Sequence, residues 1–211
     1  MNIENALKKY KAYFTEKIET HGADPKGVDY NGFEAQEIRF DQLIKVINSS
    51  AAVSIIDYGC GYGALFDFLQ KKNLQFTYYG FDMIEKMAVA GKDAHKDFVN
   101  VRFFHSESDL MVADYLVAGS IFNNKFEANN DEWQNMISAT LQRMNALCSK
   151  GFAFNMLTKY SDEDRMALRP DLFFGDPLFF FDFCKRNFSR NVALLHDYGI
   201  YDFTILVRKD V

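Results

Sequence analysis

Three glycines stand within five positions directly after an apolar run, in the stretch SIIDYGCGYGALFDFL of residues 54–69. The β-branched run of residues 51–57, followed closely by glycine, predicts a buried strand that ends in a tight turn. Glycine adopts backbone angles that a Cβ forbids, and it lets a ligand touch the main chain. A turn that enters a helix also presents N–H groups that can bind negative or polar ligand groups. The stretch therefore predicts a strand, a turn and a helix that form a ligand site.

Strand and helix patterns alternate along the rest of the chain. Further strands are predicted over 75–82, 98–105, 114–122 and 151–158, and helices over 62–72, 83–96, 131–148 and 177–187. Near-continuous apolar strands that alternate with helices indicate a parallel sheet covered on both faces. The strands 191–197 and 201–209 are joined too tightly for a parallel crossover, so they form an antiparallel pair. The fold class is therefore α/β, a doubly wound, Rossmann-like, seven-stranded mixed sheet with an antiparallel C-terminal hairpin.

Two helices precede the first strand. Apolar residues recur at helical spacing over 3–20, and a second helix is predicted over 33–48, with turn residues between them. A length of 211 residues suits one α/β domain of ordinary size. We expect a single domain over 1–211, with an N-terminal helical cap over 1–49 and a Rossmann-like core over 50–211.

Composition and charge exclude several classes of protein. The net charge of −5 argues against a nucleic-acid binder. The three cysteines lie far apart without metal-ligand spacing, which indicates reduced thiols in a cytoplasmic protein and no metal site. The longest apolar stretch, 172–183, is interrupted by Asp176, Pro177 and Asp182, so no membrane span is predicted.

The position of the acids distinguishes between possible nucleotide ligands. The run reads Asp57-x-Gly59-x-Gly61-x-Gly63, which is neither the GxGxxG spacing of dinucleotide binders nor a Walker loop. A carboxylate at Asp57 would repel a pyrophosphate, but it would tolerate a cofactor that carries a sulfonium and an ammonium. Asp82 ends the next strand, where ribose hydroxyls lie in such folds. An NAD-dependent oxidoreductase is therefore disfavoured.

The stretch IIDYGCGYGAL, followed by YYGFDMIEKM, resembles the class I S-adenosylmethionine (SAM)-dependent methyltransferases. The resemblance covers residues 51–209, and EIRFDQL and HDYGIYDFTILVRK are similar to small bacterial members of unassigned substrate. It implies SAM as the cofactor and Asp82 as the ribose-binding acid. The residues of the first motif and of the following strand end that it places at the cofactor are Asp57, Gly59, Cys60, Gly61, Gly63, Asp82 and Met83.

The resemblance implies further cofactor contacts after the third and fourth strands. Adenine would be held after the third strand. Ser106 and Glu107 match the family's adenine-binding pair by position, and Asp109 is the alternative adenine-binding acid. Main-chain groups near Ala118, with Ser120, would pass the methionine end. For the cofactor carboxylate the candidate is Arg39; pairing of Arg39 with Glu34 or Glu37 is the alternative. Tyr62 could flank the sulfonium or simply begin a helix.

The sequence identifies no catalytic residue. Displacement of a methyl group from a sulfonium needs alignment and desolvation, and it needs a base only for some acceptors. A small-molecule acceptor is expected, over the ends of the fourth and fifth strands. The turn before the second helix contributes four candidate bases that cannot be ranked: His21, Asp29, Tyr30 and Asn31. A SAM-binding module without turnover remains the alternative function.

Overall fold

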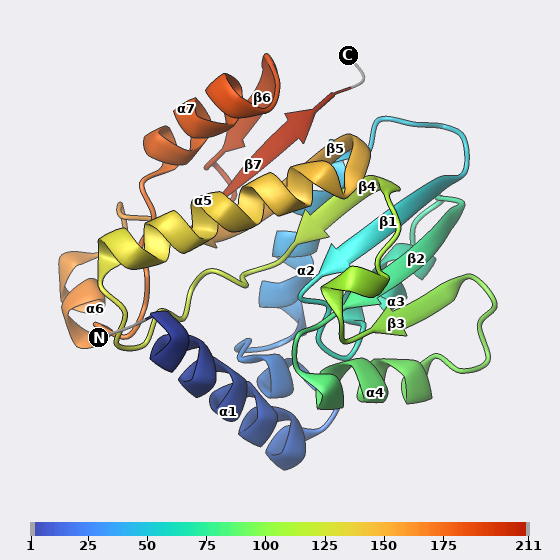
Figure 1. Cartoon of the computed structure of the whole chain (residues 1–211), viewed down its shortest axis with the longest axis horizontal. Helices are drawn as coiled ribbons and strands as arrows, with labels where there is room; N and C mark the ends of the chain where they lie inside the picture. Colours follow the sequence, from blue (N-terminus) through green and yellow to red (C-terminus); the bar gives the residue numbers. More distant parts are fainter. Residues whose placement is uncertain (1–2, 210–211) are drawn as a thin grey trace.

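The computed structural model describes residues 3–209, which form a seven-stranded sheet with helices on both faces (Figure 1). The strands follow the order β3-β2-β1-β4-β5-β7-β6. Their bounds are β1 Val53–Tyr58, β2 Phe76–Phe81, β3 Val101–Phe104, β4 Ala113–Ala118, β5 Cys148–Leu157, β6 Asn191–Leu195 and β7 Asp202–Arg208. Strands β1 to β5 are parallel, and β7 runs antiparallel to both of its neighbours. The predicted fold class is confirmed.

Strand order reverses between β1 and β4, the position where doubly wound sheets bind their ligands. The helices are α1 Ile3–His21, α2 Phe33–Leu43, α3 Ala64–Gln70, α4 Glu85–Ala94, α5 Asn130–Ala146, α6 Glu163–Leu168 and α7 Pro177–Asn187. Figure 1 shows α5 and α7 on one face of the sheet, and α1 across the edge at which the parallel strands end. Helix α1 therefore covers the switch point.

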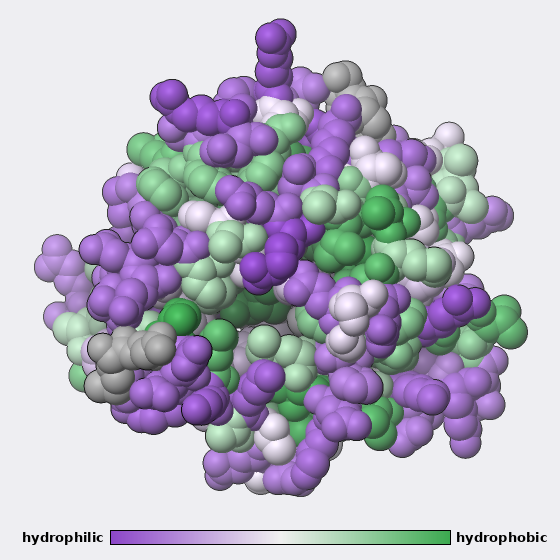
Figure 2. Space-filling model, in the orientation of Figure 1, coloured by the Kyte–Doolittle hydropathy of each residue, from purple (hydrophilic) through white to green (hydrophobic). Residues whose placement is uncertain are grey.

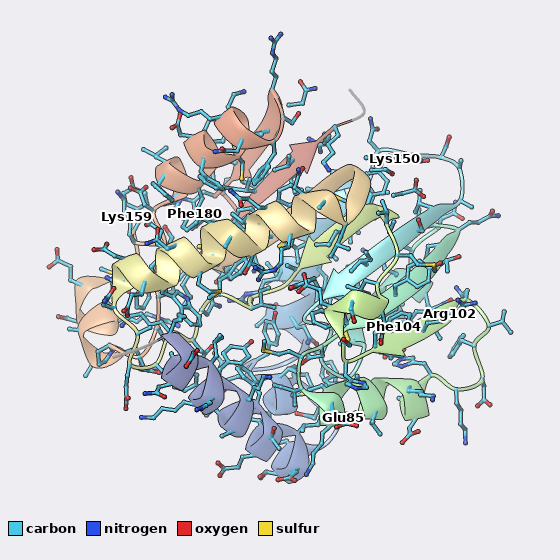
Figure 3. The ribbon with its side chains drawn as sticks, in the orientation of Figure 1. Glu85, Arg102, Phe104, Lys150, Lys159 and Phe180 are labelled. Carbon is cyan, nitrogen blue, oxygen red and sulfur yellow. The ribbon has the colours of Figure 1, made fainter. Side chains whose placement is uncertain are left out.

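Two apolar clusters, one on each face, hold the sheet between its helices. One contains Trp133 and Phe180 with side chains of β4, β5 and β7, and the other contains Phe40 and Phe66 with side chains of β1 and β2. Figure 3 shows Phe180 where α7 meets the sheet, away from α1. It is fully buried in the cluster that packs against β4, β5 and β7.

Local hydrogen bonds cap the N-termini of two helices. Asp176 accepts a hydrogen bond from Leu178 N, and Pro177 follows it as the first residue of α7. Helix α5 begins with a reciprocal capping box between Asn129 and Glu132. These local bonds fix where both helices begin, and thus how they lie on the sheet.

Several predicted boundaries differ from the structure for local reasons. The strand predicted over 114–122 ends at Ala118, because Ser120 adopts a left-handed backbone conformation (φ 59°). The helix predicted from 62 begins at Ala64, since Gly63 before it has φ 94°. The helix predicted over 33–48 ends at Leu43 and continues as a short 3-10 turn. Helix α6 lies in a segment predicted as loop.

Two broader expectations concern membranes and metals. Within residues 3–209, none of the helices combines the length and the hydrophobicity that crossing a bilayer requires. The same part of the chain contains no group of three or more His, Cys, Asp or Glu side chains that could hold a metal ion.

Candidate functional site

A cavity of about 230 Å³ lies at the carboxyl ends of β1, β2 and β4, beneath α1. Figure 2 shows a hollow bordered by hydrophobic residues on the face of the molecule that carries α1 and α5. The predicted site residues that line the cavity are Asp57, Gly59, Cys60, Gly61, Asp82, Met83, Glu107 and Ser120, and Tyr30 and Tyr62 join them. The predicted residues that do not line it are Arg39, Gly63, Ser106, Asp109 and Ala118.

The glycine turn is shaped by close packing. Gly59 has φ 84°, and a Cβ on it would overlap Ile121 Cγ2. Gly63 has φ 94°, and its Cβ would lie 2.8 Å from Phe103 Cζ and 2.9 Å from His95 Cε1. Gly63 therefore serves the packing of the turn against β3 and α4, which explains a glycine at a position outside the cavity wall.

The N–H groups of the turn have partners within the protein. Gly59 N and Cys60 N donate to Phe81 O at 2.7 and 2.9 Å, Gly61 N donates to Asp82 Oδ2, and Gly63 N donates to Cys60 O. The sequence suggested that this turn offers unpaired donors to a ligand. The structure shows instead that these four N–H groups are already used, so they supply shape and space.

Asp82 is held at the end of β2 by the turn that it faces. Its Oδ2 accepts the Gly61 N–H at 2.9 Å, and its Oδ1 accepts the Ile84 N–H, also at 2.9 Å. Burial raises the pKa of this carboxyl to about 6, against the lowering effect of these two bonds. Each carboxylate oxygen keeps a second lone pair, so Asp82 can accept two further hydrogen bonds from a ligand in the cavity.

Asp57 ends β1 as a second buried acid. Its Oδ2 accepts the hydroxyl of Tyr78 at 2.6 Å. Burial, with a smaller contribution from Asp82, raises the pKa of Asp57 to about 7. Two carboxyl groups that are costly to ionise without a partner make this end of the cavity favourable for a cation.

Glu107 lies on the opposite side, in the short segment between β3 and β4. Its Oε1 lies 3.4 Å from Arg143 Nε of α5, and both residues line the cavity. Asp109, the alternative acid, does not line it. The hydroxyl of Ser106 bonds Ser108 instead. Of the two acids predicted after the third strand as adenine contacts, only Glu107 lines the cavity.

Arg39 is committed elsewhere. Its Nε and Nη2 donate to Asp202 of β7 at 2.8 and 2.6 Å, and the Asp202 side chain is fully buried. Asn155 Nδ2 donates to the same carboxylate at 3.0 Å, and Asn155 Oδ1 accepts the Ser120 N–H at 2.7 Å. The structure therefore replaces both sequence-based interpretations of Arg39: it binds neither Glu34 nor Glu37, and it belongs to a buried network that supports Ser120.

The cysteine in the turn is chemically inert in this setting. The Cys60 thiol is buried and donates weakly to Gly61 O at 3.4 Å. Burial raises the pKa of the thiol well above its ordinary value, with further contributions from Asp82 and Asp57. A thiol in this environment is not a nucleophile.

Part of the cavity wall was not recognisable from the sequence. Side chains of α1, α2 and α5 complete it, among them Leu7, Tyr10, Phe14, Gln36, Phe40, Trp133, Met136 and Thr140. The helical spacing of the α1 residues does signal a buried face, but spacing alone does not tell a core from a ligand wall.

The four candidate bases lie around a second hollow. It is lined by Lys17, His21, Lys26, Asp29, Tyr30 and Asn31. Asp29 there accepts hydrogen bonds from Tyr13 and Lys17. Tyr30 alone of the four also lines the main cavity.

Comparison with known proteins identifies the family. No protein-family model matches the chain. A Mycobacterium tuberculosis protein named "Putative methyltransferase Rv1506c" is 44% identical over 166 residues, which are 79% of this chain and 99% of that protein.

Solved structures share the fold at low sequence identity. Magnesium protoporphyrin IX methyltransferase from Synechocystis, with S-adenosylhomocysteine (SAH) bound, aligns with a TM-score of 0.65 at 15% identity over 96% of this chain and 99% of that one. The N-methyltransferase NodS of Bradyrhizobium japonicum, also with SAH, has a TM-score of 0.65 at 14% identity over 95% and 98%. With the glycine turn, the paired acids and this sheet order, the chain belongs to the class I SAM-dependent methyltransferases.

Proposed function

We propose that this chain transfers a methyl group from SAM, bound across the ends of β1, β2 and β4, to a small, largely apolar acceptor held beneath α1. The observation that carries the placement is Asp82, anchored by two backbone N–H groups with lone pairs left for ribose hydroxyls. Glu107 and Met83 line the adenine side of the proposed site, and Asp57, Gly59 and Ser120 line the methionine side.

The residues present fit this cofactor by charge as well as by shape. SAM brings a sulfonium and an ammonium, and the wall around the turn contains two buried carboxyl groups, Asp57 and Asp82, whose ionised forms need a cation. When bound, SAM supplies an activated methyl group. The protein contributes orientation and the exclusion of water.

The chemistry of the wall indicates the class of acceptor. Helices α1 and α5 contribute aromatic and aliphatic side chains that include Tyr10, Phe14 and Trp133. Within residues 3–209, Arg143 is the one cationic side chain in this wall, and it faces Glu107. An anionic acceptor would thus find no unpaired positive charge, and an uncharged or cationic molecule with an apolar face is favoured.

The titratable groups at the cavity indicate how the acceptor reacts. Burial raises the pKa of the Tyr10 and Tyr30 hydroxyls, so both are protonated at neutral pH. Neither is then a ready base. Since Asp57, Asp82 and Glu107 are assigned to the cofactor in this proposal, the acceptor side favours an atom that already carries an available lone pair, such as the nitrogen of an uncharged amine.

We also propose a reducing, cytoplasmic setting. Cys60, Cys148 and Cys184 are all free and buried. Unpaired thiols of this kind are typical of proteins in reducing compartments.

Two measurements test the function. Titration calorimetry should show binding of SAM and SAH but not of NADH. A screen with methyl-labelled SAM over uncharged amines, phenols and carboxylic acids should then yield labelled product in the first group. Binding without turnover on any acceptor would support a silent SAM-binding module, and absence of SAM binding would contradict the proposal.

A further inference from the structure

One buried hydroxyl of a residue in the cavity wall has no hydrogen-bond partner in the protein, and a buried amide lies beside it. Tyr62, in the glycine turn, is 5% exposed, and its hydroxyl makes no hydrogen bond. Gln36 of α2 is 4% exposed, and it also lines the cavity. The Gln36 amide approaches the Tyr62 hydroxyl closely enough to lower its pKa, without completing a hydrogen bond, while burial raises that pKa to about 12. A buried hydroxyl without a partner is rare and calls for an explanation.

These two side chains lie at the methionine side of the proposed site. Tyr62 follows Gly61 directly, and Gln36 and Tyr30 both influence its pKa, so both lie near it. Tyr30 reaches the end of β4, where its hydroxyl lies beside Gly119 and near enough to Ser120 to lower the pKa of Tyr30, which burial raises. The Tyr62 hydroxyl thus belongs to the residue next to Gly61 and lies within electrostatic reach of Tyr30, whose own hydroxyl lies beside Gly119.

Several other donors near this end have partners within the protein. Arg39 binds Asp202, and the N–H groups of Gly59, Cys60, Gly61 and Gly63 bond within the protein. Arg143 lies on α5 against Glu107. A carboxylate that enters this end therefore meets neither a free guanidinium nor these four N–H groups.

We propose that Tyr62 O–H and the Gln36 side-chain amide together bind the α-carboxylate of SAM, as a pair of neutral donors in place of an arginine. This inference rests on the proposed function, because it concerns how the same cofactor is held. The phenol and the amide each donate one hydrogen bond to the carboxylate. Neutral donors also leave the charge of Asp57 free to favour the cofactor's cationic groups, which a nearby guanidinium would oppose.

The pair carries a measurable signature in the ligand-free protein. The Tyr62 hydroxyl lowers the stability of the ligand-free fold, since it is removed from water without a hydrogen-bond partner. Tyr62→Phe should therefore leave the ligand-free melting temperature unchanged or higher, while it weakens cofactor binding. A residue that only supports the fold would lower both together.

The test compares two ligands that differ by the amino-acid tail. Binding of SAH and of 5′-methylthioadenosine, which has the nucleoside and the sulfur but no carboxylate, is measured by calorimetry for wild type, Tyr62→Phe and Gln36→Leu. Each variant should bind SAH at least about tenfold more weakly, the loss expected for one hydrogen bond to a charged group. Binding of 5′-methylthioadenosine should stay within about twofold, since that ligand does not use the donors.

Two control variants distinguish the loss of a direct contact with the cofactor from a general effect on packing. Gln42→Leu removes another buried amide of α2, and Tyr198→Phe removes a hydroxyl that bonds Thr204; neither residue lines the cavity. Both controls should bind SAH as wild type does. Unchanged SAH affinity in Tyr62→Phe and Gln36→Leu, or an equal loss for both ligands, would overturn the inference. Failure of wild type to bind either ligand would instead overturn the proposed function, and the inference with it.

Discussion

Replacement of Arg39 by methionine should damage stability far more than cofactor binding. The Asp202 carboxylate is fully buried and accepts three hydrogen bonds in the structure: two from Arg39, at 2.8 and 2.6 Å, and one from Asn155 at 3.0 Å. Methionine keeps much of the aliphatic length of arginine but removes the charge and both donors. The variant is left with a buried carboxylate and one neutral donor.

The size of the effect follows from this imbalance. Removing one partner of a buried ion pair costs about 3–5 kcal/mol, because the remaining charge is uncompensated. The reverse change, Asp202→Asn, leaves the Arg39 side chain 14% exposed and bonded to Ala35 O at 2.7 Å, so part of its charge stays solvated. We expect the double variant to lose less stability than the two single variants summed, since the buried charge and its partner disappear together.

Urea unfolding followed by circular dichroism gives the free energies, and SAH titration gives the affinities. For Arg39→Met we expect a loss of about 3–5 kcal/mol in stability, with SAH affinity within about threefold of wild type under conditions where the variant is folded. The reasoning is refuted if Arg39→Met loses less than about 1 kcal/mol of stability while SAH binding falls more than about tenfold. That outcome would indicate that the Arg39 guanidinium binds the cofactor carboxylate, as the sequence first suggested.

Three further changes test other parts of the site. Asp82→Asn should weaken SAH binding at least about tenfold, because it removes charge-assisted bonds to ribose, and calorimetry at neutral pH measures this. Gly63→Ala should lower stability by about 1–3 kcal/mol, from positive φ and contact with Phe103 and His95; an unchanged urea midpoint would contradict it. The raised pKa values of Asp57 and Asp82, about 7 and about 6, favour the neutral acids in the ligand-free fold, so its stability should fall as pH rises from about 4 to about 7, by at most about 1.4 kcal/mol per pH unit for each group. Affinity for the cationic SAM should rise over pH 6–8 with proton release, detectable as a dependence of the binding heat on the buffer.

The sequence predicted the sheet well because its signals there are local. Each strand of the core is a short apolar run that ends in turn residues, and the alternation with helices leaves few topologies. The short connection around Gly199 made the antiparallel pairing of β6 and β7 predictable before any coordinates. The beginning of α7 is a local signal of the same kind, because Asp176 and Pro177 are adjacent in the chain.

The site was predictable where one motif specifies it and not where distant elements meet. Asp57, Gly59 and Asp82 follow from the glycine spacing and from the position of strand ends. Arg39 was misassigned because its partner, Asp202, is 163 residues away in the chain, and no local pattern reports that contact. The cavity walls contributed by α1 and α5 could not be predicted either, because their residues follow ordinary helical spacing and no local pattern marks them as a ligand wall.

The internal bonding of the turn links these observations into one account of specificity. The N–H groups at Gly59, Cys60, Gly61 and Gly63 bond to Phe81, to Asp82 or within the turn, so these four are not free to hold a phosphate as in other nucleotide-binding folds. A pyrophosphate placed there would meet two buried acids and no available N–H at these four positions, whereas a cofactor with a positive charge gains from the same acids. The glycine spacing that disfavoured a dinucleotide in the sequence therefore has a structural counterpart: Phe81 O accepts two of these N–H groups, and Asp82 accepts a third.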